Sequence, residues 1–251
     1  MSSYAPEELL ACAIARLIGD AAHVAVGAAS PIPASACELL RARSGGRPRL
    51  SLMHQRTANP YTEGSRELFD LAGQGRVDVF FLGGAQIDGE ANINLVATGE
   101  YPKTDARFPG SFGSGFMYFA SKRTILFREE HSKRVLVPKV DFISAPGWSP
   151  PEVWRRGGPQ ALVTGRAIFA WDKDAAGVLF PEQDCSMRSK IHEGGAEGPR
   201  KAPPFRLHEV DVRLAVDLRA AEEEDVDAPL AREVEELARA FGEGVCRSPL
   251  L

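Results

Sequence analysis

The sequence predicts an α/β fold with a mainly parallel sheet covered by helices and a short antiparallel edge. In the first half, uninterrupted apolar runs alternate with amphipathic stretches, which is the pattern of parallel strands covered on both faces. After residue 148, short apolar segments follow one another across tight turns, which favours antiparallel pairing. With 251 residues, 44% of them hydrophobic, the chain can form one domain covering residues 1–251.

The first expected element is an amphipathic helix over residues 6–18. Pro6 suits the first helical position, Glu7 and Glu8 suit the positive end of the helix, and Gly19 ends it. The next elements alternate between strand and helix, in the order of an α/β fold. They are expected at residues 23–26 (strand), 34–43 (helix), 50–53 (strand), 64–75 (helix) and 77–82 (strand).

The second half predicts shorter strands and a closing helix. The strands are expected at residues 124–127, 134–137, 141–144, 161–164, 167–171, 177–180 and 211–218. Residues 181–204 are rich in glycine, proline and charge, which predicts an extended loop. Residues 229–241 have one apolar and one acidic face, which predicts a final helix, and the acidic run at 222–227 predicts a solvated linker.

A glycine pair follows an apolar run that is typical of a buried strand. Because glycine has no Cβ, Gly83 and Gly84 can take positive φ angles and direct backbone N–H groups, including that of Ala85, toward one point. Such donors would stabilise the oxyanion that forms from a thioester carbonyl. Gln86 and Asp88 could orient this turn through hydrogen bonds. The alternative is that the glycines only permit a tight turn.

A second glycine turn, at residues 110–115, precedes another apolar run. Its candidate residues for binding an oxyanion or coenzyme A are Gly110, Gly113, Ser114 and Gly115. Phe112 and Phe116 could line an apolar acyl pocket, and core packing explains them equally well. Between the two turns, Asn92 and Asn94 are expected to bond nearby backbone groups.

These features together resemble the β subunit of glutaconate-type family I CoA-transferases. The resemblance rests on GGAQID at residues 83–88, an Asn-x-Asn step at 92–94, a GSxG turn at 110–113, RVLVPKVDFISAPG at 134–147 and GPQ at 158–160. It covers residues 77–164. It implies a CoA-transferase-like α/β fold, an acyl-CoA substrate with a carboxylated acyl group, and an active site shared with a partner α subunit in a heterodimer or heterotetramer.

The sequence departs from that family at the nucleophile. In the family it resembles, a glutamate at the end of a strand upstream of GGAQID attacks the thioester, forming the mixed anhydride that transfer requires. Here the corresponding strand runs through Met53 into His54 without a carboxylate. His54 is therefore the candidate catalytic residue, as a base, while Glu63 and Glu67 fit a solvated helix better. The resemblance then implies that the partner supplies the nucleophile or base.

Other functions stay open. Relatives with this fold act as acyl-CoA hydrolases or lyases, including one that cleaves a steroid ring. A non-catalytic scaffold subunit, or a self-sufficient thioesterase with His54 as base, is also consistent with the sequence. A dinucleotide site is disfavoured because the glycines do not match G-x-G-x-x-G, and a serine hydrolase is disfavoured because no G-x-S-x-G elbow occurs.

Composition narrows the partners and the compartment. A net charge of -4 argues against nucleic acid, and no apolar run is long enough to span a membrane. The N-terminal charges Glu7, Glu8 and Arg16 do not fit a signal peptide, so a cytoplasmic protein is expected. The 4 cysteines lack metal or redox spacing, which predicts free thiols and no metal ion.

Overall fold

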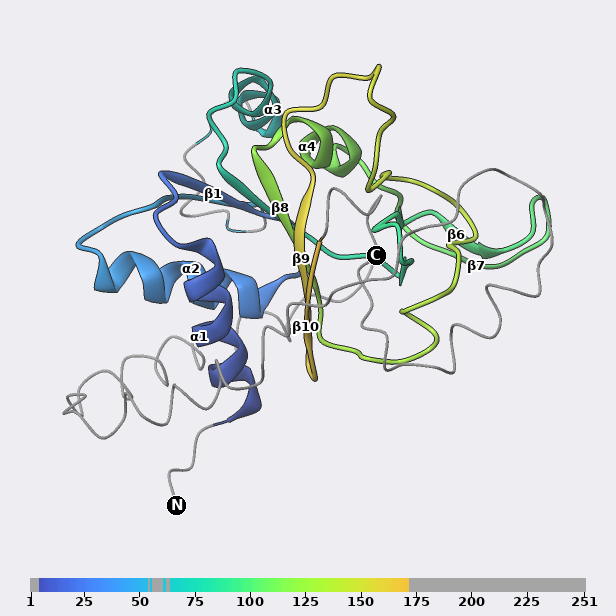
Figure 1. Ribbon diagram of the computed structural model, residues 1–251, viewed down its shortest axis with the longest axis horizontal. Coiled ribbons are helices and arrows are strands. Elements are labelled where there is room, and N and C mark those ends of the chain that lie inside the picture. Colours follow the sequence, from blue (N-terminus) through green and yellow to red (C-terminus); the bar gives the residue numbers. More distant parts are fainter. Residues whose placement is uncertain (1–4, 54, 56–60, 62–63, 172–251) are drawn as a thin grey trace.

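The structure of the protein, a computed structural model, describes residues 5–53, 55, 61 and 64–171 (Figure 1). Its centre is a six-stranded sheet in the order β10-β9-β8-β3-β1-β2. The strands are β1 (His23–Val26), β2 (Arg49–Leu52), β3 (Val79–Leu82), β8 (Arg123–Arg128), β9 (Pro159–Thr164) and β10 (Ile168–Ala170). Neighbouring strands pair in parallel except β10, which pairs antiparallel to β9. The predicted α/β fold with an antiparallel edge is confirmed.

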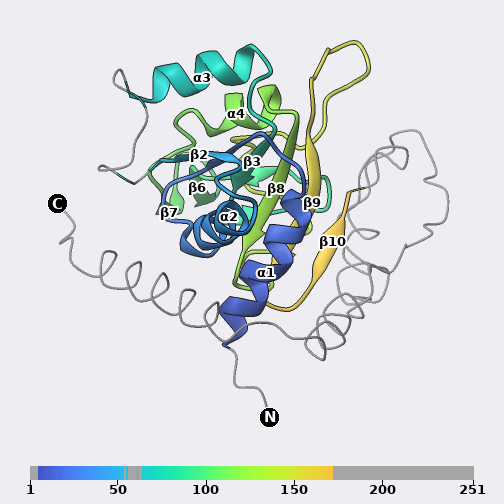
Figure 2. The same cartoon turned by 90° about the vertical axis from the view of Figure 1, so that its left-hand side faces the viewer.

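Helices cover both faces of this sheet. On one face lie α1 (Pro6–Ile18) and α2 (Pro31–Arg43), and on the other lie α3 (Ser65–Gly73) and α4 (Ser114–Ala120) (Figures 1 and 2). α2 begins at Pro31, earlier than expected from the sequence, because a first helical turn tolerates proline.

The two central strands, β1 and β3, are buried on both faces. Val24, Val79 and Phe81 belong to the core that includes α1 and α2, whereas Ala25 and Phe80 belong to the core that includes α3 and α4. A strand between two helix layers has no solvent-facing side, so its sequence shows no polar alternation. This explains the uninterrupted apolar runs from which these strands were predicted.

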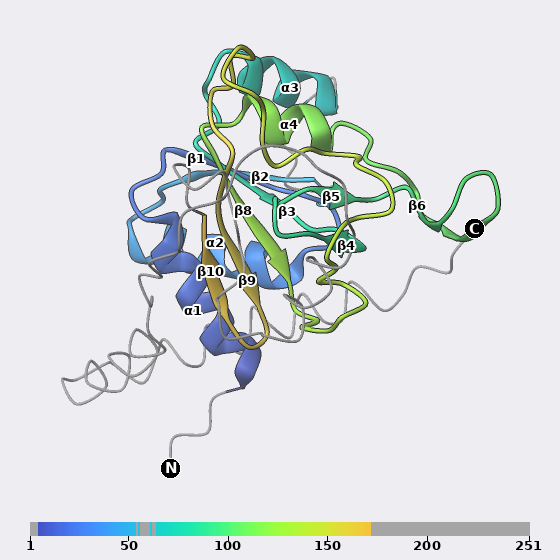
Figure 3. The same cartoon turned by 45° about the vertical axis from the view of Figure 1, so that its right-hand side comes forward.

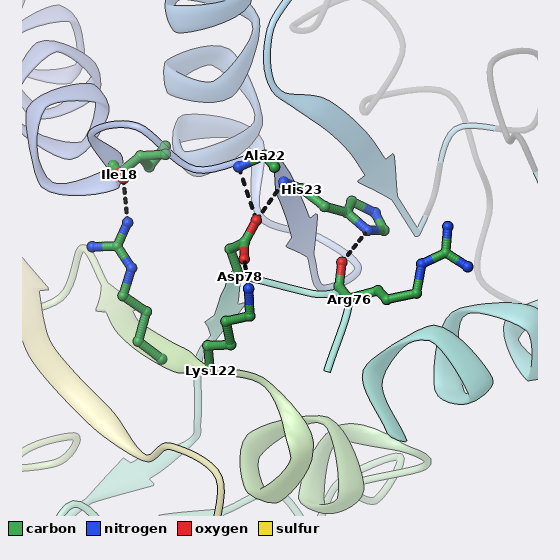
Figure 4. Close-up of polar contacts among 7 residues, drawn as sticks. Ile18, Ala22, His23, Arg76, Asp78 and Lys122 are labelled. Carbon is green, nitrogen blue, oxygen red and sulfur yellow. Dashed lines mark hydrogen bonds and ion pairs between the residues drawn. The ribbon is translucent and has the colours of Figure 1, made fainter. Parts of the chain in front are cut away.

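Side-chain and backbone contacts fix both ends of α1. At its start, the Glu8 carboxylate accepts a hydrogen bond from the Ala5 amide at 2.8 Å. At its end, Gly19 takes a φ angle of 54°. The guanidinium of Arg123, from the start of β8, donates to the Ile18 carbonyl oxygen (Figure 4). This contact attaches the last turn of α1 to the sheet.

Asp78, which directly precedes β3, connects the amino ends of three parallel strands. Its carboxylate accepts hydrogen bonds from the amides of Ala22 and His23 at 2.8 and 2.9 Å, next to β1 (Figure 4). Lys122, just before β8, forms an ion pair with it at 2.6 Å. Burial opposes the negative charge, but these donors outweigh it and lower the pKa of Asp78 below its ordinary value.

Two small hairpins and α4 were not predicted from the sequence. β4 (Gln86–Ile87) pairs with β5 (Ile93–Asn94), and β6 (Ala97–Gly99) pairs with β7 (Thr104–Arg107). The β6–β7 hairpin projects away from the sheet (Figures 1 and 3). These strands have 2 to 4 residues and α4 has 7, which is too short for a clear periodic pattern.

The strands expected at residues 134–137 and 141–144 are wrong. This segment contacts the β4–β5 hairpin through isolated bridges, one at Leu136 and one at Ala145. Both side chains are buried, as their apolar character suggests. A hairpin with 2 residues in each strand offers too few free backbone groups for a continuous ladder.

Several expectations lie outside the described residues. They are the strands at 177–180 and 211–218, the loop at 181–204, the linker at 222–227 and the helix at 229–241. No helix in the described part of the chain has the length and apolar character needed to cross a membrane. Cys37 is buried in α2, where burial raises the pKa of its thiol, so it cannot serve as a ready thiolate.

Candidate active site at the carboxyl edge of the sheet

A pocket of about 230 Å³ lies beside the end of β2. In α/β sheets, ligands bind beyond the carboxyl ends of the parallel strands, which is where β2 ends. The pocket is lined by Ser51, Leu52, Met53, Tyr61, Ser65 and Phe112. These residues offer hydroxyl groups and apolar surface, and none of these described lining residues is a carboxylate.

A chain of hydrogen bonds runs from the sheet interior to the wall of this pocket. The His23 ring has its Nδ1 at 3.0 Å from the Arg76 carbonyl oxygen (Figure 4) and its Nε2 at 2.7 Å from Ser51 Oγ. Ser51 Oγ in turn lies 2.5 Å from the Tyr61 hydroxyl. Because Ser51 and Tyr61 both line the pocket, the chain ends at the cavity surface.

The surroundings of His23 favour a neutral ring. Burial lowers the pKa of His23 below its ordinary value, and the Arg49 and Arg76 charges act in the same direction. The Arg76 carbonyl and the Asp78 carboxylate oppose this change without cancelling it. Arg49 also lies over the Tyr61 ring, with its Cζ 5.8 Å from the ring centroid. The charged groups of β1, β2 and the start of β3 therefore leave an unprotonated ring nitrogen at neutral pH.

Three phenylalanines gather beside the pocket. The Phe69 ring centroid lies 6.2 Å from that of Phe112 and 6.0 Å from that of Phe116. Phe112 is 85% exposed and has a φ of 46°, a left-handed conformation that is strained for a bulky residue. Gly113 makes room for Phe69, because a Cβ at this position would collide with that ring. Phe112 lines the pocket, and Phe116 packs on Phe69 beside it.

The first glycine pair, after β3, permits close packing. A Cβ on Gly83 would lie 2.9 Å from the Phe127 carbonyl oxygen, and one on Gly84 would lie 2.7 Å from Ile93 Cγ2. Neither glycine has a positive φ, so that expectation is wrong. Among the described residues, the amides of Gly83 and Gly84 donate none of the hydrogen bonds that join turns and loops.

The next two residues of this turn are engaged within the fold. The Ala85 amide donates to the Asn94 carbonyl oxygen at 2.9 Å, so it is not the bare donor that the sequence predicts. The buried Gln86 side chain accepts a hydrogen bond from Asn94 Nδ2 at 2.7 Å and donates to Asp141 at 3.0 Å. These contacts correct the prediction that Ala85 and Gln86 contact the ligand, because their polar groups already hold the β4–β5 hairpin.

The orienting role expected for the other polar residues of the turn is confirmed. The Asp88 carboxylate accepts hydrogen bonds from the Asn92 amide at 2.9 Å and from Asn92 Nδ2 at 3.1 Å. Asn92 Oδ1 accepts from the Gly147 amide at 3.1 Å, and Asn94 Oδ1 accepts from the Val96 amide at 3.0 Å. These side chains stabilise the loops around β4 and β5.

The second glycine turn is also partly committed to its own fold. The Gly110 amide donates to the Leu95 carbonyl oxygen at 2.9 Å, and the Ser114 amide makes a turn hydrogen bond at 2.8 Å. These two amides are therefore not the exposed donors that the sequence predicts, since turn closure uses them. Gly115 lies close to another backbone segment, because a Cβ there would be 3.2 Å from the Ser144 carbonyl oxygen.

Sequence reasoning and structure select different polar residues. His54 lies outside the described residues, although its neighbour Met53 lines the pocket. The contact between His23 and Ser51 joins positions 28 residues apart, so no local motif could reveal it. In the part of the chain that the structure describes, no group of three or more metal-ligating side chains could hold a metal ion.

The match to a protein family is extensive. A family model described as Coenzyme A transferase matches residues 7–164, from α1 to the end of β9. The chain belongs to the coenzyme A transferase family. This is the family that the GGAQID, Asn-x-Asn and GSxG motifs resemble, so the prediction of the family is confirmed.

Two relatives of this coenzyme A transferase chain are β subunits. The β subunit of glutaconate CoA-transferase from Acidaminococcus fermentans is 35% identical over 102 residues, which is 38% of this chain and 38% of that protein. The β subunit of 3-oxoadipate CoA-transferase from Pseudomonas knackmussii is 29% identical over 196 residues, which is 67% of this chain and 74% of that protein. The aligned region thus spans well under half of the first relative and about three quarters of the second.

Solved structures share the fold. The decarboxylase AibA/AibB is 26% identical with a TM-score of 0.55, over 66% of this chain and 73% of that chain. Glutaconate coenzyme A-transferase from Acidaminococcus fermentans has a TM-score of 0.59 at 22% identity, over 68% and 76% of the two chains. Rhodococcus jostii RHA1 IpdAB has a TM-score of 0.59 at 20% identity, over 72% and 80%. The last two matches show the common fold.

Proposed function

We propose that this chain is the β-type subunit of a heteromeric CoA-transferase-like enzyme that acts on a carboxylated acyl-CoA thioester. The chain supplies oxyanion-binding backbone and the acyl pocket, and the partner α subunit supplies the nucleophile or base. The observation that carries this proposal is the pocket beside the end of β2, where Met53 lines the wall and none of the described lining residues is a carboxylate.

Transfer chemistry explains why a partner is needed. A carboxylate must attack the thioester, form a mixed anhydride and then hold coenzyme A while the acyl product leaves. The thioether of Met53 cannot do this. Two relatives are named as β subunits, which supports an enzyme with a second kind of subunit. The missing carboxylate is therefore assigned to the α subunit.

Two backbone donors remain for the oxyanion after the engaged amides are removed. They are the amides of Gly83 and Gly84, at the carboxyl end of β3, a central strand. Gly113 and Gly115, at the start of α4, remain candidates for contacts with coenzyme A. In a site without water, one well-placed oxyanion donor lowers the barrier by about 3 kcal/mol.

The acyl group is assigned to the pocket next to the phenylalanine cluster. Phe112 and Phe116 provide apolar surface, and the hydroxyls of Ser51, Tyr61 and Ser65 provide polar contacts. The two relatives are named for glutaconate and 3-oxoadipate, which are dicarboxylic acids. This supports an acyl group that carries a second carboxylate.

An acyl-CoA hydrolase or lyase of the same fold is the second candidate. A decarboxylase, AibA/AibB, shares the fold at 26% identity, so the family fold accommodates chemistry other than transfer. Within this chain, the hydrogen bonds from His23 to the pocket wall favour a reaction that moves a proton.

The test is coexpression with an α-type subunit from the same organism. The copurified complex should convert the CoA thioester of a dicarboxylic acid, followed by chromatography of the thioesters and of free coenzyme A. Either subunit alone should be inactive. Failure of the two chains to associate, together with no conversion by the mixture, would contradict the assignment.

His54 can be assigned in the same assay. Replacing His54 by alanine in the complex should lower turnover if this side chain is a base at the site. Unchanged turnover would place all of the acid–base chemistry elsewhere.

A further inference from the structure

We propose that His23, Ser51 and Tyr61 form a proton relay that acts as a general base in the pocket and directs a water molecule to the thioester, so that this site hydrolyses acyl-CoA. The inference rests on the proposed function, because it assumes that the pocket receives the acyl-CoA carbonyl. It adds a base carried by this chain to a site whose nucleophile is assigned to the partner.

The Arg76 carbonyl sets the direction of every hydrogen in the relay. A carbonyl oxygen can only accept, so His23 Nδ1, at 3.0 Å from it, carries the ring hydrogen. The neutral ring then has a lone pair on Nε2, and Ser51 Oγ donates to it at 2.7 Å. Ser51 has spent its only hydrogen, so its oxygen accepts from the Tyr61 hydroxyl at 2.5 Å. All of the hydrogens point from the pocket toward His23.

This polarity makes the pocket end of the chain a proton acceptor. When a water molecule meets the Tyr61 oxygen, each hydroxyl can pass its own hydrogen inward and take another from the pocket side. The proton finally arrives at His23 Nε2, a buried base whose charge would otherwise be unfavourable. Tyr61 is the residue that touches the water, and Ser51 and His23 act through it.

The groups that face His23 are consistent with a base that works near neutral pH. Arg49 of β2 and Arg76 disfavour an added positive charge, and Asp78 at the start of β3 stabilises it. The pKa of the ring is lowered, so the ring is unprotonated before the reaction. Asp78, with its carboxylate 2.9 Å from the His23 amide, is positioned to compensate part of the charge once the proton arrives.

The hydrolytic step balances as follows. The water oxygen forms a bond to the thioester carbonyl carbon, and its proton moves to the Tyr61 oxygen. The Tyr61 proton moves to Ser51 Oγ, and the Ser51 proton moves to His23 Nε2. The carbon–sulfur bond then breaks with its electron pair on sulfur. The coenzyme A thiolate takes up a proton that returns from His23 along the same relay, so the free acid and the thiol leave.

The decisive comparison is between hydrolysis and transfer in the reconstituted complex. Tyr61→Phe keeps the ring and removes the relay oxygen, and Ser51→Ala interrupts the relay in the middle. General-base assistance contributes about 100-fold, so both variants should lose hydrolysis by about this factor. The KM should change little, and transfer to an added carboxylic acid should persist, since transfer needs no activated water. The acid limb of the wild-type pH–rate profile should disappear in both variants.

His131→Gln is the matched control. His131 Nδ1 also lies 2.9 Å from a hydroxyl, Thr164 Oγ1, but His131 is not among the residues that line the pocket. This variant should keep wild-type hydrolysis and its pH profile. Thermal unfolding of each complex checks that the fold persists, and Tyr61→Phe carries the test if Ser51→Ala does not fold.

The outcomes separate the relay from the proposed function. Wild-type hydrolysis in both relay variants would overturn the relay, and so would an equal loss of hydrolysis and transfer, because that pattern indicates a structural role. A wild-type complex that neither transfers nor hydrolyses any acyl-CoA would overturn the proposed function itself, and the relay with it.

Discussion

Phe112 combines two features that are individually unusual. It is a large apolar side chain exposed to 85%, and its backbone has a φ of 46°. A left-handed conformation costs a bulky residue about 1 kcal/mol or more, so surrounding contacts must hold it there. Its neighbours are Phe69 and the pocket, which makes a ligand role more economical than a folding role.

The first prediction follows from this exposure. Phe112→Ala should change the free energy of unfolding by less than about 0.5 kcal/mol, because little buried area is lost. It should raise the KM for acyl-CoA about 10-fold by removing pocket surface. Tyr101→Ala, at another strongly exposed aromatic next to the β6–β7 hairpin, should leave the KM unchanged. Equal effects of the two variants would remove Phe112 from the acyl pocket.

The second prediction concerns the buried His23. Its folded pKa lies below that of the unfolded chain, because burial disfavours the charged ring. As the pH falls through the ordinary histidine range, the unfolded chain takes up a proton that the folded ring excludes. The free energy of unfolding should therefore fall with decreasing pH in this window and be unaffected by this group above it.

Urea unfolding at several pH values measures this dependence. His23→Gln should flatten the slope between pH 7 and the lowered folded pKa, whereas His131→Gln should keep the wild-type slope. A His23→Gln protein with the full wild-type slope would show that this ring is not the group responsible.

At the scale of elements, the turn from β3 into β4 depends on the absence of a side chain. A Cβ on Gly84 would lie 2.7 Å from Ile93 Cγ2 and 2.9 Å from the Gln86 carbonyl oxygen. The backbone contact cannot move without displacing the hairpin. The glycine pair thus serves the fold in addition to the oxyanion role proposed for its amides.

The third prediction compares two glycines. Gly84→Ala should lower the free energy of unfolding by about 2 kcal/mol, through overpacking against the hairpin. Gly73→Ala, in the last position of α3, would place its Cβ 3.7 Å from Phe116 Cζ, an ordinary contact. It should stabilise the protein by up to about 1 kcal/mol through helix propensity. Chemical denaturation of both variants checks the opposite signs.

The fourth prediction tests the connection of strands by Asp78. Asp78→Asn keeps the shape but weakens the contacts to the Ala22 and His23 amides and to Lys122, so stability should fall by about 2 kcal/mol. The exposed Asp70 of α3 supplies the control, since Asp70→Asn should change stability by less than about 0.5 kcal/mol. Equal denaturation midpoints for the two variants would contradict the proposed importance of this carboxylate.

At the scale of the whole molecule, the proposed partner should stabilise the fold. A partner that binds only the folded chain adds about 2.7 kcal/mol when its concentration is 100 times the Kd. The melting temperature of the mixture should therefore rise with partner concentration. A titration monitored by calorimetry checks this, with an unrelated protein at equal concentration as the control. A melting temperature independent of partner concentration would contradict assembly.

The central strands and the helices that cover them were open to prediction because their signals are local. The all-apolar segment that contains Phe80 can only belong to a strand covered on both faces, and Pro6 and Gly19 mark the ends of α1. The strand expected around Leu136 failed for a related reason, since an apolar pattern reports burial and does not report a pairing partner.

The sequence by itself determined the fold class, the family motifs and the loss of a carboxylate after β2, because each depends on residues that are close together in the chain. Only the tertiary structure decided which polar groups are spent on the fold and which reach the pocket. The Gln86–Asp141 contact joins residues 55 positions apart, and His23 reaches Ser51 across 28. Hydrogen bonds between distant segments form only after the hydrophobic core has brought the strands together, so no local pattern encodes them.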